Sequence, residues 1–435
     1  QINATGTIAS VALDIPFQYA VYVGLISILL CSMLGGMRGV TWTQVAQYIV
    51  LIIAYLLPVF WISNKMGAGF FPHFMLADEV ARIGELEQQF GFVKNSAADL
   101  ATVPKGLAGI TKAHSAVNAT PWAFISLALA MMMGTASLPH VMMRYFTTPS
   151  VKAARKSVGW SLFFIFLLYS SAPMLATLSK LSLIDPTLST GIIGKSFAEV
   201  QSIDWFQNWN QANLMFISDF NGNGTLELNE FFMGGKAVVL ATPEIAGLPY
   251  VISGLVAAGG MAAAMSTADG LILAIANAIS HDVYYKMIDP KAETAKRLLV
   301  ARALLVVIGF AGATIAAMEI QGILGSVIWA FDFAMSGLFF PLVLGVWWKR
   351  ANRQGAIAGM ALGLASSIWY LVWVRSGGSG FLGLTQLTFG IFGAGVSFVS
   401  MVVVSLITSA PDAATQKMVD EVRIPSGKSI LGKQH

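Results

Sequence analysis

Charged residues and cysteine are scarce in this sequence. Only 11% of its 435 residues are Asp, Glu, Lys or Arg, whereas soluble domains carry about a quarter, so a large soluble domain is excluded. The single cysteine, Cys31, lies in an apolar run, which excludes an intrachain disulfide and favours a small buried side chain. The net charge of +4 is modest for a chain of this length, so the sequence does not indicate a basic surface that binds nucleic acid.

The start of the chain lacks a methionine and a targeting signal. Its first residues, QINATGTIASVALDIP, have neither the basic start nor the small-residue cleavage site of a signal peptide. We therefore expect this sequence to be a piece of a longer protein.

Long apolar runs dominate what is present. Hydrophobic residues make up 56% of the chain, and the mean hydropathy is +0.70. A helix needs about 20 apolar residues to cross a bilayer, where it satisfies its own backbone polar groups. Nine runs predict an all-α integral membrane protein, and they cover residues 17–35, 41–63, 121–143, 158–178, 250–279, 298–318, 322–348, 355–374 and 387–407.

The basic residues predict how these spans are oriented. Lysine and arginine cluster in the third, fifth and seventh connections, and basic residues in short loops stay in the cytoplasm. Acidic residues outnumber basic ones in the fourth connection, residues 179–249. We therefore expect residues 179–249 to be extracytoplasmic and the C-terminus to be cytoplasmic. In the other long outer loop, residues 64–120, DEVARIGELEQQFGFV has helix-compatible composition. We expect it to be a solvated connector, and a helix lying on the surface is the alternative.

Hydroxyl and small residues share one face of the fifth span. Ala263, Ser266, Thr267 and Gly270 follow the spacing i, i+3, i+4 and i+7. Two hydroxyls and a freed backbone carbonyl are hard oxygen donors that suit a partly dehydrated alkali cation. The alternative is that small residues pack helices and each hydroxyl bonds a carbonyl of its own helix.

Two aspartates lie inside predicted spans. A carboxylate near mid-membrane costs roughly 2.5–3.5 kcal/mol, so it is seldom kept without a partner or a water-filled cavity. Asp269 and Asp332 are therefore candidate ligands of a coupling ion or proton, and a structural hydrogen bond is the alternative for each.

The third span is interrupted by GTASLPH, residues 134–140. Pro139 removes a backbone amide donor, and Gly134 lowers the free-energy cost of opening the helix. Broken helices expose backbone dipoles to the substrate in many secondary transporters. The alternative is a proline kink without a ligand.

A calcium-loop pattern lies in the fourth connection. SDFNGNGTLELNEFF, residues 218–232, fits the EF-hand spacing D-x-[DN]-x-[DN]-G-x5-E, with Gly224 at the sharp turn. The candidate ligands are Asp219, Asn221, Asn223, Thr225, Glu227 and Glu230. Few charged ligands predict weak affinity, and the alternative is a turn that binds nothing. The sequence contains no second, paired EF-hand pattern, which favours a structural role over a regulatory switch.

These residues together resemble the sodium/solute symporter family, and within it the bacterial cation/acetate symporter-like proteins. The resemblance rests on GTASLPHVMMRYFT at 134–147, RKS at 155–157, AAAMSTADG at 262–270 and ISHDVYYKM at 279–287. It implies the leucine-transporter-like inverted-repeat fold, with roughly three core helices missing upstream. It also implies a sodium site at Ala263, Ser266 and Thr267. Asp269 is not a general feature of the family, and its candidacy as a further ligand rests on its place inside the span.

The resemblance implies substrate contacts at the broken helix. Thr135, Ser137 and His140 are the candidate residues there. The implied organisation is residues 1–63 for the end of the first repeat, 64–120 for a loop, 121–348 for the second repeat with an insert at 200–236, 349–408 for two further spans and 409–435 for a tail.

The implied function is sodium-coupled symport of a small organic solute, such as acetate, across the inner membrane. Sodium, the solute and the lipid bilayer are the expected partners, calcium is an expected structural ion, and no obligate protein partner is evident. The alternative is a transporter-like membrane sensor with a calcium-binding loop. We do not expect an enzyme, because His281 and Asp282 at a helix end are better explained as a cap.

Overall fold

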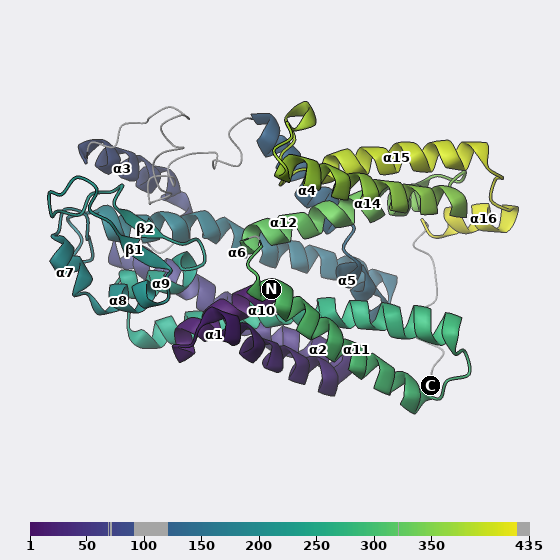
Figure 1. The fold of residues 1–435 in the computed structure, drawn as a ribbon, viewed down its shortest axis with the longest axis horizontal. Helices are drawn as coiled ribbons and strands as arrows, with labels where there is room; N and C mark the ends of the chain where they lie inside the picture. The colour runs from purple at the N-terminus through teal and green to yellow at the C-terminus, as the bar shows by residue number, and fades with distance from the viewer. Residues whose placement is uncertain (68, 70–71, 91–120, 321, 424–435) are drawn as a thin grey trace. The chain divides into compact units, whose positions relative to one another are not determined.

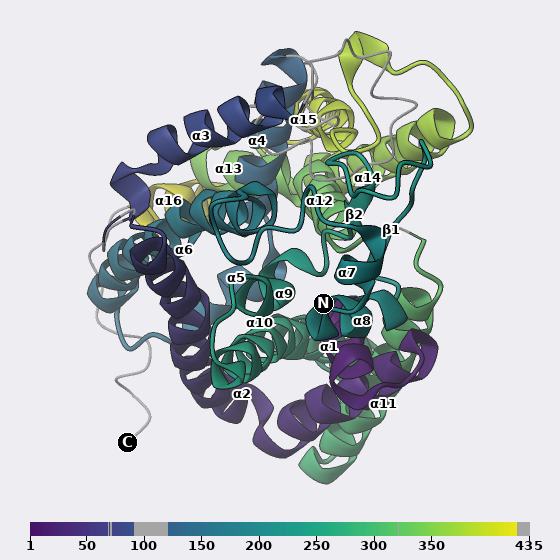
Figure 2. The ribbon, with the colours of Figure 1, turned by 90° about the vertical axis from the view of Figure 1, so that its left-hand side faces the viewer.

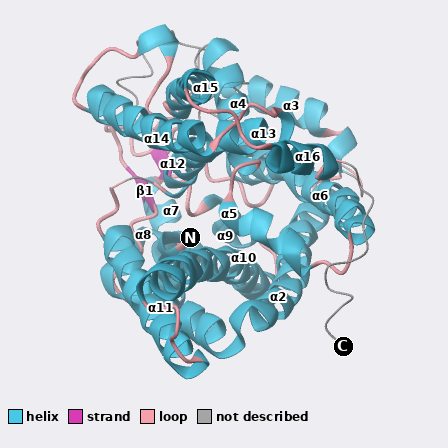
Figure 3. Cartoon of the chain, turned by 90° about the vertical axis from the view of Figure 1, so that its right-hand side faces the viewer, coloured by secondary structure: helices cyan, strands magenta, loops and turns pink. Residues whose placement is uncertain are grey.

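The computed structural model describes residues 1–67, 69, 72–90, 121–320 and 322–423 (Figure 1). Apart from one short strand pair, the regular structure of this part of the chain is helical (Figure 3). Eight of its helices are long and apolar enough to cross a membrane, and one bent helix pair makes nine. The nine predicted spans are therefore confirmed.

The chain divides into two compact units. The first is built from residues 1–113 and 161–320, and the second from residues 114–160 and 321–435. The helix α6 (Val151–Ile184) begins in the second unit and continues into the first.

The membrane helices of the first unit pack around α2 (Phe17–Lys65). This helix holds the first two predicted spans and bends at Gly36, where φ is 53°. Figure 2 shows α1 (Ile2–Leu13), α10 (Tyr250–Asn277) and α11 (Thr294–Ala317) gathered around the first half of α2. The helix α10 continues as a π-helix, η6 (Ala278–Ile288). Apolar side chains of α2, α10 and α11 form the core between them.

A small domain outside the predicted spans completes the first unit. It contains α7 (Phe197–Gln201), α8 (Asp204–Gln211), the antiparallel strands β1 (Met215–Ile217) and β2 (Phe231–Met233), and α9 (Val238–Ile245). Two further elements precede it in the chain, η1 (Pro72–Phe74) and α3 (Leu76–Gln89). One apolar core joins side chains of this domain to Ile83 of α3 and Leu181 of α6.

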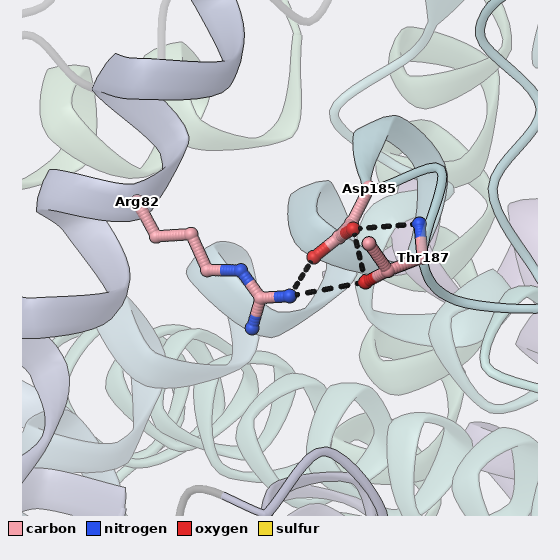
Figure 4. A network of polar contacts seen from close by, with 3 residues as sticks. All are labelled: Arg82, Asp185 and Thr187. Carbon is pink, nitrogen blue, oxygen red and sulfur yellow. Dashed lines mark hydrogen bonds and ion pairs between the residues drawn. The ribbon is translucent and has the colours of Figure 1, made fainter.

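Two ion pairs hold α3, and one of its faces is buried, so the expectation of a solvated connector is wrong for residues 78–90, while residues 91–93 of that segment lie outside the described residues. Arg82 forms an ion pair with Asp185, and its guanidinium also donates to Thr187 Oγ1 at 3.3 Å (Figure 4). Glu87 pairs with Lys180, which is fully buried. Burial raises the pKa of Glu79, and nearby Arg82 opposes this effect.

The second unit joins the bent helix pair to the C-terminal helices. Its elements are α4 (Pro121–Thr135), α5 (Pro139–Met142), η5 (Met143–Thr147), α12 (Ile323–Ala334), the π-helix η7 (Met335–Phe339), α13 (Phe340–Trp347), α14 (Arg353–Arg375), η8 (Phe381–Gly383), α15 (Gly390–Ile407) and α16 (Ala413–Glu421). Along α14, Gly355, Gly359, Gly363 and Ser367 recur every four residues and are buried. Small residues at this spacing let α15 approach closely.

Candidate functional site

The candidate cation ligands of α10 converge on one backbone carbonyl. Ser266 Oγ donates to the carbonyl oxygen of Ala263 at 2.9 Å, and Thr267 Oγ1 lies 3.5 Å from the same oxygen. Both side chains are half-buried. The three oxygens that the sequence pattern singled out are thus neighbours, and each hydroxyl bonds its own helix, as the packing alternative also requires.

A glutamine of α2 joins this group, and the sequence analysis did not identify it. Gln44 Nε2 donates to the carbonyl oxygen of Ser266. The two helices approach closely two turns away, since a Cβ placed on Gly259 of α10 would clash with the Cβ of Ala54 of α2. The signal that was available is the presence of two amide side chains, Gln44 and Gln47, within one predicted span.

Asp269 is fully buried one turn further along α10. Ser32 Oγ, from the first half of α2, donates to Asp269 Oδ1 at 2.9 Å. Its neighbours Ala268 and Ile272 belong to the apolar core shared with α2 and α11. This contact provides the structural hydrogen bond that was one of the two predicted roles.

The predicted break in the third span is present. The helices α4 and α5 are bent by 46° relative to each other. Thr135 Oγ1 donates to the carbonyl of Met131 at 2.6 Å, and Ser137 Oγ to that of Met133 at 2.7 Å. Ser137 is buried, Thr135 is exposed, and His140 is half-buried. The hydroxyls therefore bond the last turn of α4.

His140 differs from the two hydroxyl residues. Its Nδ1 atom is buried and has no hydrogen-bond partner among the described residues. Gly134, at the start of the break, allows α12 to come close, because a Cβ there would lie 2.6 Å from the Cβ of Phe331. The break thus contains one buried ring nitrogen without a partner among the described residues, and α12 packs closely at its start.

The loop at residues 219–230 is closed by its own carboxylates. Asp219 accepts hydrogen bonds from the amides of Gly222 at 2.7 Å and Gly224 at 3.1 Å. Glu230 accepts from the amides of Phe220 at 2.9 Å and Glu227 at 3.0 Å. These contacts turn the first and last predicted ligands toward the loop interior.

The remaining predicted ligands are also engaged within the loop. Glu227 Oε1 accepts from the amide groups of Asn221 at 3.0 Å and Asn223 at 2.9 Å. The Asn223 side-chain oxygen accepts from the amide of Thr225 at 2.7 Å. In the described part of the chain, no group of three or more His, Cys, Asp or Glu side chains is arranged to hold a metal ion. Calcium binding therefore stays a prediction.

The loop is anchored to the preceding segment. Gly224 has a φ of 73°, which a side chain would disfavour. Leu226 is fully buried, its amide donates to the carbonyl of Lys195, and its carbonyl accepts from the amide of Gly194, both at 2.8 Å. This short pairing fixes the loop independently of an ion.

Comparison with known proteins identifies relatives over most of the chain. A family model described as the sodium:solute symporter family matches residues 1–183 and 236–363. The chain is 33% identical to an uncharacterized symporter of Cupriavidus necator, over 97% of this chain and 74% of that protein. It is 27% identical to a monocarboxylic acid transporter of Corynebacterium glutamicum, over 85% of this chain and 59% of that protein.

A solved structure has a similar fold. It is a sodium-coupled sialic acid symporter in a substrate-bound outward-open state. The TM-score is 0.57 at 17% sequence identity, over 94% of this chain and 71% of that chain. The symporter fold predicted from the sequence is thereby confirmed.

Proposed function

Because this chain belongs to the sodium:solute symporter family, we propose that it imports a small organic solute by sodium-coupled symport. The family match over residues 1–183 and 236–363 carries this proposal. The monocarboxylic acid transporter among its relatives supports short-chain carboxylates, such as acetate, as the substrate class. The protein is then a multi-pass protein of the inner membrane.

The proposed sodium ligands are on α10. They are the carbonyl of Ala263 and the hydroxyls of Ser266 and Thr267, whose mutual proximity supports the assignment. Asp269 would add negative charge on the same helix. Sodium binding there would stabilise an outward-open state by its higher affinity for that state.

The proposed substrate contacts are at the break between α4 and α5. Thr135 and Ser137 offer hydroxyls, and His140 offers a ring nitrogen without a protein partner among the described residues. Half-helix ends and unwound backbone bind substrates in many secondary transporters. A carboxylate solute would accept hydrogen bonds from these groups.

Contacts within each unit support the proposed topology. In the first unit, Lys236 of the fourth connection pairs with Glu319 of the sixth at 2.6 Å. In the second, Lys349 of the seventh connection pairs with Asp420 of the tail at 2.7 Å. Each pair joins segments for which the distribution of basic residues predicts the same side of the membrane, extracytoplasmic for the first pair and cytoplasmic for the second.

Sodium-driven uptake tests the proposal directly. Liposomes containing the protein should accumulate labelled acetate or another short-chain carboxylate when sodium is higher outside. Collapsing the sodium gradient with an ionophore should abolish accumulation, and protein-free liposomes provide the background of passive entry. Sodium-independent accumulation, or none for any small carboxylate, would refute the proposal and favour the sensor alternative.

Calcium binding by the loop of residues 219–230 is a second part of the proposal. Its donor set contains carboxylate and amide oxygens, which calcium prefers, and Gly224 provides the sharp turn. When bound, the ion would add a structural crosslink to a loop that is already closed by hydrogen bonds. Its role is then to stabilise the small domain.

The stability of the protein should respond to calcium. With an affinity of about 0.1–1 mM, 10 mM calcium should stabilise the domain by about 1.4–2.7 kcal/mol. Thermal melting with and without calcium measures this effect. Asp219→Asn should remove it, whereas Asp204→Asn, outside the loop, should preserve it. Equal shifts in both variants would contradict loop binding.

A further inference from the structure

Asp332 lies in the last turn of α12. This helix packs against α4, α14 and α15 of the second unit (Figure 1). Asp332 is fully buried, neither carboxylate oxygen accepts a hydrogen bond from a side chain of the described residues, and the backbone amide of Gly390 at the start of α15 lies beside it. Gly390, the first residue of α15, packs directly on it, because a Cβ there would lie 2.6 Å from Oδ1. The carboxyl group is thus sealed within protein.

The surrounding helices bring no counter-charge to Asp332. The described helices that pack on α12 and η7 are α4, α13, α14 and α15, and their only titratable residues are Arg353, Tyr370 and Arg375 of α14. Arg375 covers the ring of Trp329, with Cζ 5.2 Å from the ring centroid. Tyr370 donates its hydroxyl to the carbonyls of Phe381 at 3.1 Å and Leu384 at 3.2 Å.

With one backbone amide beside it and no charged side chain to pair with, a buried carboxylate is neutralised rather than kept charged. The neighbouring hydroxyls do not form a ready cage for a metal ion. Ser336 Oγ donates to the carbonyl of Asp332 at 2.6 Å, and Ser367 Oγ donates to Ser336 Oγ at 2.6 Å. A Cβ on Gly393 would lie 2.7 Å from Ser336 Oγ, so α15 fills this space. The space beside Asp332 therefore suits a proton on the carboxyl group but not a sodium ion, which needs several free oxygen ligands.

We propose that Asp332 is a proton-binding site of the transporter and carries a proton in this conformation. A proton from water adds to a carboxylate oxygen, and it returns to water when a conformational change wets the site. The π-helix η7 begins three residues later, and Pro341 interrupts the helical hydrogen-bond pattern beyond it. This is the weakest part of the span and the expected place of opening.

Infrared spectroscopy tests the bound proton without any transport assay. The wild-type protein at neutral pH should show a protonated-carboxyl band that Asp332→Asn removes and the exposed control Asp282→Asn retains. Asp332→Asn should melt at or above the wild-type temperature, because asparagine resembles the neutral acid. A band that Asp332→Asn leaves unchanged, or a marked loss of stability, would show an ionised Asp332 and overturn the inference.

The consequence for transport rests on the proposed function. The initial rate of sodium-driven uptake, normalised to its maximum, should fall at alkaline pH in the wild type and in Asp282→Asn, and stay flat in Asp332→Asn. The same pH profile in all three proteins would overturn the proton-coupling role. A higher sodium requirement in Asp332→Asn would identify an alkali-ion site instead. If the wild type shows no uptake, the proposed function fails. The infrared result then still shows whether Asp332 carries a proton.

Discussion

Thr267→Ala and Ser266→Ala are each expected to raise the sodium concentration for half-maximal uptake by about 10- to 100-fold. Each removes one oxygen donor from the group around the Ala263 carbonyl. An interaction with a charged group contributes about 1.5–3 kcal/mol, and about 1.4 kcal/mol is a factor of ten in affinity. Uptake of labelled solute at graded sodium concentrations measures the effect.

The chain offers a matched control for these variants. Thr314 of α11 makes the same kind of bond within its own helix, because its hydroxyl donates to the carbonyl of Phe310 at 2.9 Å. Thr314→Ala should leave the sodium dependence unchanged, and Thr267→Ser, which keeps the hydroxyl, should stay close to wild type. Unchanged sodium dependence in both Ser266→Ala and Thr267→Ala would refute the assignment of the site to α10.

The nine spans could be predicted from the sequence because length and polarity alone decide whether a segment can cross a bilayer. The break before Pro139 could be predicted as well, since proline cannot donate the amide hydrogen bond. The helix α1 was missed because its 12 residues are too few for a span. Its place beside α2 depends on a close approach, where a Cβ on Gly24 would lie 2.5 Å from Thr5 Oγ1.

The candidate site could be predicted only in its local part. Ser266 and Thr267 are near Ala263 because one helix fixes their spacing. Gln44 and Ser32 are more than 200 positions away in the sequence from the α10 groups they contact. No periodicity within a single helix encodes such partners, so the roles of Gln44 and Ser32 became apparent only when α2 and α10 were seen together.

The buried charges of α3 show the same limit. The pattern of DEVARIGELEQQFGFV is compatible with a helix, but it does not reveal that Glu87 and Ile83 face the protein interior. Lys180 lies just beyond the fourth predicted span, where a lysine ordinarily reaches water. In the structure it is fully buried and pairs with Glu87.

Glu87→Gln is expected to destabilise the protein by about 3–5 kcal/mol, because it leaves the buried ammonium group of Lys180 without its carboxylate. Chemical denaturation of the protein in detergent, compared with the wild type, measures the change. The loss should be large because Lys180 is fully buried and cannot recover its hydration without displacing α3.

Replacing both Glu87 and Lys180 distinguishes two contributions to the free energy of unfolding, the penalty for a lone buried charge and the stabilisation by the ion pair itself. Glu87→Leu combined with Lys180→Met should recover most of the stability, since apolar side chains of similar size suit the core around Ile83 and Leu181. Breaking the exposed pair of Asp282 and Lys286 by Asp282→Asn should cost only about 0–1 kcal/mol. A double variant as unstable as Glu87→Gln would mean that the pair itself, rather than the avoided lone charge, holds α3 against α6.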